Sequence, residues 1–224
     1  MDFIIPGAIH LNDVTRITLT MIPFFSWVVV ILILFASGTM LVDRDWRVKL
    51  AMLAVQYLAA SWLITRHQPF AMGAVKLVTG WMIIAALGMT RLEISRSSDE
   101  EAINIGPHGY WYPIILMSIA MVVTAGATPR IEAMIPGLGF QVIAGSLLLI
   151  TSGFIHLGTT ADVFRVVLGL LVLILGFETI YAAVESSILV AGLLAITNLA
   201  MGLVGCYLLL ANSPPLPVME EEQL

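Results

Sequence analysis

The sequence predicts an all-α, polytopic integral membrane protein with about seven transmembrane helices. Its 224 residues are 59% hydrophobic and only 11% charged, and the mean hydropathy of +1.00 is far above that of soluble domains. Several segments in succession reach the roughly 20 apolar residues that a helix needs to cross the hydrocarbon core. The alternating apolar and polar pattern of membrane β-strands is absent from the sequence.

Seven apolar segments form a single expected membrane domain within the chain 1–224. They cover residues 20–42, 48–66, 70–90, 111–128, 136–157, 162–184 and 187–211. The bundle therefore spans 20–211, and its last two helices form a C-terminal hairpin at 162–211. No segment is long and polar enough to predict a separate soluble domain.

The connections carry turn and cap signals. Residues 91–110 hold several charges together with Gly106, Pro107 and Gly109, which predicts an exposed loop. The stretch TPRIEAMIPG after span four is too short to cross the membrane and has proline near both ends, so we expect it at the interface. Asp162 is placed to cap the sixth helix.

Both termini are expected outside the hydrocarbon. Residues 1–19 include Asp2, His10, Asp13 and Arg16 and lack the ordered features of a removable signal peptide, so they predict an N-terminal interfacial segment. The tail 212–224 contains SPPLP followed by the acidic residues Glu220, Glu221 and Glu222, which predicts an extended, solvated chain.

Basic residues predict the orientation. Arg16, Arg66 and Arg130 would lie on one face of the membrane, and a larger set would lie on the other: Arg44, Arg47, Lys49, Arg91, Arg96 and Arg165. The positive-inside rule places the larger set in the cytoplasm, with the N-terminus outside and the C-terminus inside. The ten basic residues are scattered and form no nucleic-acid-binding patch.

Three polar residues lie well inside apolar spans: Lys76, Glu178 and Asn198. At 1.5 Å per residue, they fall roughly 10, 12 and 17 Å below the same membrane face. Lys76 and Glu178 can therefore pair directly or through water. Such a pair is read either as part of a proton or cation relay or as a static contact that fixes helix packing, and both readings remain open.

Neighbouring residues extend this region. Glu185 follows Glu178 by seven residues and shares its helix face, either as a solvated interfacial carboxylate or as a proton-transfer group. Tyr181 is placed to donate a hydrogen bond near Glu178 or to face the interface. Small residues in span seven would allow close helix approach: Gly192, Ala195, Gly202 and Gly205.

Metal and cofactor chemistry has little support in the sequence. The four histidines, His10, His67, His108 and His156, have no metal-ligand spacing, and Cys206 is the single cysteine. A haem or quinone site at His108 and His156 is the weaker reading beside ordinary interfacial histidines. We expect no bound cofactor or metal, and no catalytic reaction carried by this chain alone.

The segment from Leu168 to Ala211 contains G-F-E followed by I-Y-A and resembles the K-type subunit of complex I and the C subunit of multisubunit cation/proton antiporters. A second carboxylate expected from that resemblance falls at Asn198. With its additional N-terminal spans and Lys76, the whole chain looks more like component E of hydrogenase-4-type membrane complexes.

The resemblance implies a subunit of a complex I-related or hydrogenase-type assembly in the inner (plasma) membrane, where Glu178 and Lys76 contribute to proton or cation translocation. Its partners would be other integral membrane subunits, including antiporter-like ones, within the lipid bilayer. Two alternatives remain: a packing or anchoring subunit whose polar residues only fix helix contacts, and a small autonomous transporter.

Overall fold

The computed structural model describes residues 8–43, 45–97, 111–160, 162–185 and 187–213. Within these residues the chain forms seven α-helices: α1 (Ala8–Val42), α2 (Trp46–Ile64), α3 (Phe70–Ser97), α4 (Trp111–Met134), α5 (Phe140–Thr159), α6 (Val163–Val184) and α7 (Ile188–Ala211). Each helix contains a stretch long and apolar enough to cross a membrane. The protein is therefore a polytopic helical membrane protein, which confirms the predicted fold class.

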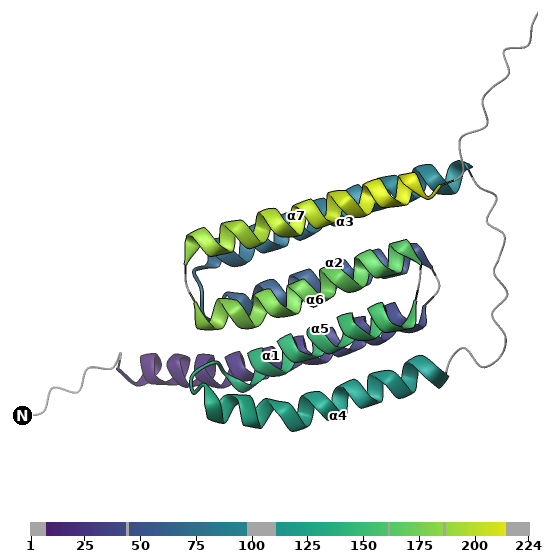
Figure 1. Ribbon diagram of the computed structural model, residues 1–224. Helices are drawn as coiled ribbons and strands as arrows, with labels where there is room; N and C mark the ends of the chain where they lie inside the picture. The colour runs from purple at the N-terminus through teal and green to yellow at the C-terminus, as the bar shows by residue number, and fades with distance from the viewer. Residues whose placement is uncertain (1–7, 44, 98–110, 161, 186, 214–224) are drawn as a thin grey trace, which may run out of the picture.

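The helices alternate in direction and stack in layers (Figure 1). Helices α3 and α7 lie side by side at one edge, followed by α2 with α6 and then α1 with α5, while α4 packs on the other edge. The α2–α3, α4–α5 and α6–α7 connections share one end of the bundle, called the α6–α7 end below. The α1–α2 and α5–α6 connections share the other, called the α5–α6 end.

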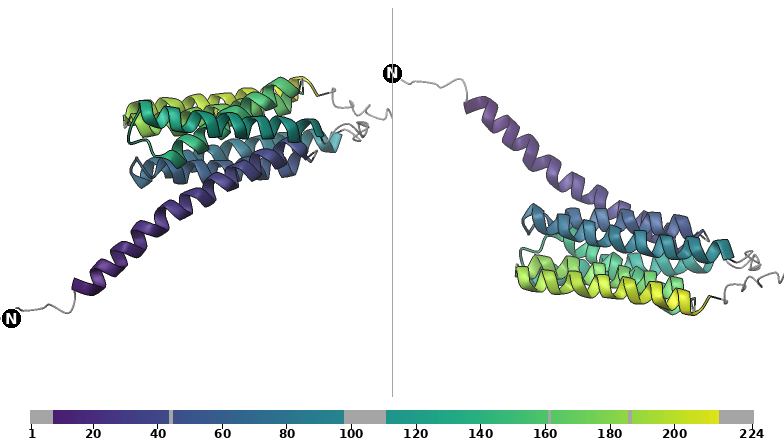
Figure 2. Two further views of the ribbon diagram at one scale, coloured as in Figure 1. Left: turned by 90° about the horizontal axis from the view of Figure 1, so that it is seen from below. Right: turned by 90° about the horizontal axis from the view of Figure 1, so that it is seen from above.

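Helix α1 is longer than its membrane span. It begins at Ala8, whereas its apolar stretch covers Phe24–Val42. Figure 2 shows its N-terminal part leaving the bundle at an angle. The segment expected at the interface is thus helical from Ala8 onward and continuous with the first span.

Helices α3 and α4 also extend past the expected boundaries. Helix α3 continues to Ser97, so the first seven residues of the expected 91–110 loop are helical, and 98–110 lie outside the described residues. Helix α4 continues through Pro129 to Met134, where we expected an interfacial connection. A helix can continue past the hydrocarbon because polar side chains there reach water, and proline removes only one backbone donor.

Glycines hold α5 and α6 together. A Cβ atom added at Gly153 would lie 2.8 Å from the Cα atom of Leu173, and one added at Gly176 would lie 2.8 Å from the backbone nitrogen of Ile150. The two backbones therefore approach closely, as small residues allow in membrane helices. This contact fixes the position of α6, which carries Glu178.

We expect Gly153→Ala to lower the free energy of unfolding by about 1–3 kcal/mol, because the added methyl group forces two backbones apart. Gly158→Ala is the matched control on α5, since a Cβ atom there has nothing within 4 Å. Unfolding of the purified protein in mixed micelles, followed by circular dichroism, measures both. Equal stabilities for the two variants would show that the close approach is unimportant.

Candidate functional site

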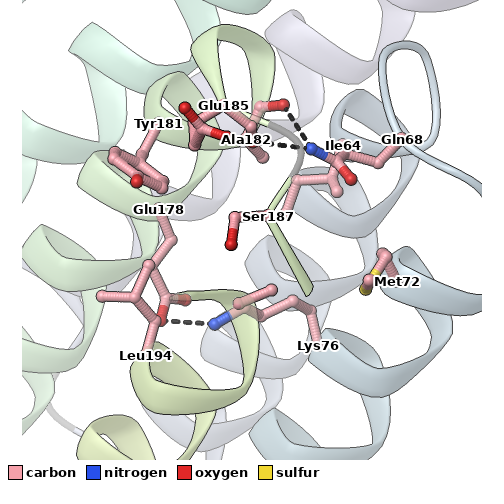
Figure 3. Close-up of a pocket in the computed structure, with 11 residues that line it drawn as sticks. Ile64, Gln68, Met72, Lys76, Glu178, Tyr181, Ala182, Glu185, Ser187 and Leu194 are labelled. Carbon is pink, nitrogen blue, oxygen red and sulfur yellow. Dashed lines mark hydrogen bonds and ion pairs between the residues drawn. The ribbon is translucent and has the colours of Figure 1, made fainter. Parts of the chain in front are cut away.

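Lys76 of α3 and Glu178 of α6 form an ion pair inside the bundle (Figure 3). Lys76 lies six residues from the start of α3 and Glu178 six residues from the end of α6, so both sit roughly 9 Å inside the α6–α7 end. Only 6% of Lys76 and 1% of Glu178 is exposed. The sequence predicts similar depths for these two residues, and in the structure they are in contact.

Burial makes this pair costly to disturb. Removing water from two charges costs several kcal/mol per ion, and their mutual attraction offsets that cost only while both charges remain. One oxygen of the pair can still accept a hydrogen bond, because Glu178 Oε2 is buried without a hydrogen-bond donor from any described residue. That oxygen can accept a hydrogen bond or a proton without breaking the contact between Lys76 and Oε1.

A small cavity borders the ion pair on its α6–α7 side. Its volume is about 30 Å³, which is enough for one or two water molecules. It is lined by Ile64, Gln68, Met72, Lys76, Glu178, Tyr181, Ala182, Glu185, Ser187, Ala191 and Leu194. Because the Glu185 residue is exposed, the cavity connects the buried pair to the end of the bundle.

Gln68 fixes the rim of this cavity. Its Nε2 atom donates to the carbonyl oxygens of Ala182 at 2.9 Å and Glu185 at 2.8 Å, as Figure 3 shows. These carbonyls belong to the last turn of α6, whose final C=O groups have no partner within the helix. The α2–α3 connection is thereby tied to the α6–α7 connection. Gln68 could not be predicted from the sequence, because its partners are backbone atoms distant in the chain.

Asn198 contacts Tyr57 rather than Glu178. Asn198 Nδ2 donates to the Tyr57 hydroxyl at 2.9 Å, and the hydroxyl lies 3.2 Å from Asn198 Oδ1. Both residues are fully buried, and the Tyr57 ring packs where a Cβ atom of Gly80 would otherwise lie. The helices that carry this pair, α2 and α7, both pack on α6, which carries Glu178. The sequence analysis did not identify Tyr57, although two adjacent polar residues inside an apolar span, Gln56 and Tyr57, could have indicated it.

The remaining candidates lie around the cavity without joining the pair. Tyr181 lines the cavity and stacks on Phe177 with ring centroids 6.0 Å apart. No described hydroxyl donates to Glu178, so the hydrogen bond considered for Tyr181 is not formed. Glu185 is exposed at the C-terminal end of α6, in agreement with the interfacial reading.

Three of the four small residues in span seven are buried at helix contacts. Ala195, Gly202 and Gly205 are buried, whereas Gly192 is exposed with nothing near its missing side chain. A Cβ atom at Gly202 would meet Ile83 of α3, and one at Gly205 would meet Val167 of α6. Helix α7 therefore lies across both helices that carry the ion pair.

The other ionisable candidates lie toward the α5–α6 end. Asp162 is the residue before α6 but makes no side-chain cap hydrogen bond, and its Oδ2 lies 3.9 Å from Arg165 Nε. His156 is buried one turn inside α5 rather than exposed at its edge, and His108 lies outside the described residues. Among the described residues, no three His, Cys, Asp or Glu side chains are grouped to hold a metal ion.

Comparisons with protein-family models, with curated proteins and with solved structures find no match to this chain. The likeness to complex I K-type subunits and hydrogenase component E thus rests on the sequence motif alone. The physical case for a function rests on the buried polar residues.

A double-mutant cycle tests the Tyr57–Asn198 pair. Tyr57→Phe leaves the buried Asn198 amide unpartnered, and Asn198→Leu leaves the Tyr57 hydroxyl unpartnered, so we expect each to destabilise the protein by about 1 kcal/mol. The double variant should be more stable than the sum of these losses implies, with a coupling energy of about 0.5–1.5 kcal/mol. The same micellar unfolding measurement provides these values. Strictly additive losses would mean that the two groups do not depend on each other.

Proposed function

We propose that this protein is a membrane subunit of a complex I-related or hydrogenase-type assembly, in which the Lys76–Glu178 pair takes part in proton or cation translocation. The observation that carries the proposal is a buried ion pair beside a water-sized cavity that leads to one end of the bundle. Ionisable residues within membrane spans are rare and mark ion pathways by default.

The geometry supports a simple exchange. A proton arriving through the cavity binds Glu178 Oε2, which has no other donor, and neutralises the carboxylate. Lys76 then loses its counter-charge and becomes able to release a proton or to attract another anion. The net charge of the site changes by one, and this change is the signal that a neighbouring subunit can sense.

The same proposal includes the setting of the chain. Among described residues, the α5–α6 end carries Arg47, Lys49, Arg91, Arg96 and Arg165, whereas Arg16, Arg66 and Arg130 lie on the side of the α6–α7 end. The positive-inside rule then favours a cytoplasmic α5–α6 end in a plasma membrane. Large apolar side chains cover the outer faces of α3, α4 and α7, which suits lipid or the antiporter-like subunits that the sequence resemblance implies.

A packing or anchoring subunit is the second candidate. The observation that favours it is the direct contact between Lys76 and Glu178, because a pair that never separates would serve only to align α3 with α6. An autonomous transporter has less support. Transporter sites of that kind are typically built from discontinuous helices, and the described membrane spans are unbroken.

Substitution of both charges separates the two candidates. Glu178→Gln alone leaves Lys76 buried without a partner, which we expect to cost about 3–5 kcal/mol, whereas Lys76→Gln with Glu178→Gln removes both charges and recovers most of that loss. We expect the double variant to assemble and to show no coupled proton uptake. Uptake is measured with a pH-sensitive dye in energised membrane vesicles, after the assembly and its companion subunits are purified and identified.

Glu132→Gln is the control, because Glu132 is a carboxylate of α4 that does not line the cavity, and it should keep normal uptake. Normal uptake by an assembled double variant would exclude the translocation role and support the packing role. Purification of the chain as a homo-oligomer without other subunits would exclude membership of such an assembly.

A further inference from the structure

A second set of buried polar residues lies between the ion pair and the α5–α6 end. We call it the polar seam; it comprises Ser37 of α1, Lys49 and Gln56 of α2, and Ser152 and His156 of α5. All five are buried, with exposed fractions between 0 and 4%. Lys49 and Gln56 are seven residues apart, and Ser152 and His156 are four apart, so each pair shares one face of its helix.

The centre of the polar seam is a directed chain of hydrogen bonds. Gln56 Nε2 donates to Ser37 Oγ at 2.9 Å, Ser37 Oγ donates to Ser152 Oγ at 3.3 Å, and Ser152 Oγ donates to the Leu149 carbonyl at 3.0 Å. Three helices thus meet through polar atoms in the middle of an apolar core. Gln56 Oε1 is left buried without a hydrogen-bond donor from the described part of the chain.

The outer part of the seam is basic. Lys49 and His156 each lie three residues from a helix end, roughly 5 Å inside the α5–α6 end, and they interact electrostatically with each other and with Arg165. His156 packs against Gly169 of α6: a Cβ atom added at Gly169 would lie 2.9 Å from the Cβ atom of His156. Its Nε2 atom is buried without a hydrogen-bond partner from any described residue.

Three orphaned polar atoms therefore follow one another in depth. His156 Nε2 lies about 5 Å from the α5–α6 end, Gln56 Oε1 about 15 Å and Glu178 Oε2 about 22 Å, counted along their helices. Gln56 lies on α2, which packs on α6, the helix of Glu178. Buried polar atoms without protein partners are the places where internal water is held.

We propose that the polar seam is a hydrated proton path between the α5–α6 end and Glu178. It approaches Glu178 from the side opposite to the cavity. The inference rests on the proposed function and extends it to five further residues. A proton binds His156 Nε2, passes along water held at Gln56 Oε1, and reaches Glu178 Oε2. Only N–H and O–H bonds form and break, and one positive charge moves with the proton.

Two measurements on the intact assembly test the path. We expect His156→Leu to lower proton uptake at least about tenfold, as loss of a proton-transfer group does. His67→Leu is the control, because His67 is an exposed histidine at the α6–α7 end, and it should leave uptake unchanged.

The second measurement is thiol labelling. In a Cys206→Ser background, Ser152→Cys should react with a small water-soluble thiol reagent at least about tenfold faster than Ser146→Cys, because the reactive thiolate needs water. Ser146 is an equally buried serine on the same helix that bonds only its own turn.

The outcomes separate this inference from the proposed function. If removal of both charges at Lys76 and Glu178 abolishes uptake while His156→Leu retains it, the seam is not the path and the ion pair keeps its role. Equal, slow labelling at Ser152→Cys and Ser146→Cys would likewise overturn the seam, even where His156→Leu fails to assemble. Loss of uptake in His156→Leu together with fast labelling of Ser152→Cys supports it.

Discussion

Two opposite charges in a hydrocarbon environment must stay together, and this requirement organises the bundle around Lys76 and Glu178. The pair links α3 to α6 through side chains, although the two helices are distant in sequence and pack on α2 and α7 rather than directly on each other. Helix α7 lies across both through Gly202 and Gly205, and the close α5–α6 contact at Gly153 fixes α6 from its other side. Small residues thus position the charges, because only short side chains let the backbones approach closely enough.

The polar atoms around this pair are arranged asymmetrically. Toward the α6–α7 end the pair borders a small cavity with Gln68 and Glu185 at its rim, whereas nearer the α5–α6 end the bundle contains hydrogen-bonded side chains of α1, α2 and α5. A purely structural ion pair requires neither neighbour. Water-sized space on one side and orphaned acceptors on the other are the features expected of a site that exchanges protons.

The sequence was sufficient for the helix count, but for the central contact it supplied only the depth. Apolar length predicts seven spans, and Lys76 and Glu178 fall at similar depths below one face, which allows a contact without establishing it. Depth could not identify lateral neighbours. Asn198 was therefore grouped with Glu178, whereas the structure places it against Tyr57. The contacts of Gln68 and the Ser37–Ser152 contact could not be predicted, because they depend on which helices are neighbours. Helix ends such as Met134 could not be predicted either, because they lie among interfacial polar residues that hydropathy does not resolve.

Infrared difference spectroscopy on the working assembly tests most directly whether Glu178 changes its protonation state. During proton loading, we expect a band from a protonated carboxyl group that appears in the wild-type protein and is missing when both Lys76 and Glu178 are replaced by glutamine. Full proton translocation without any such Glu178-dependent band would mean that Glu178 does not take up a proton and that the ion pair is a structural contact.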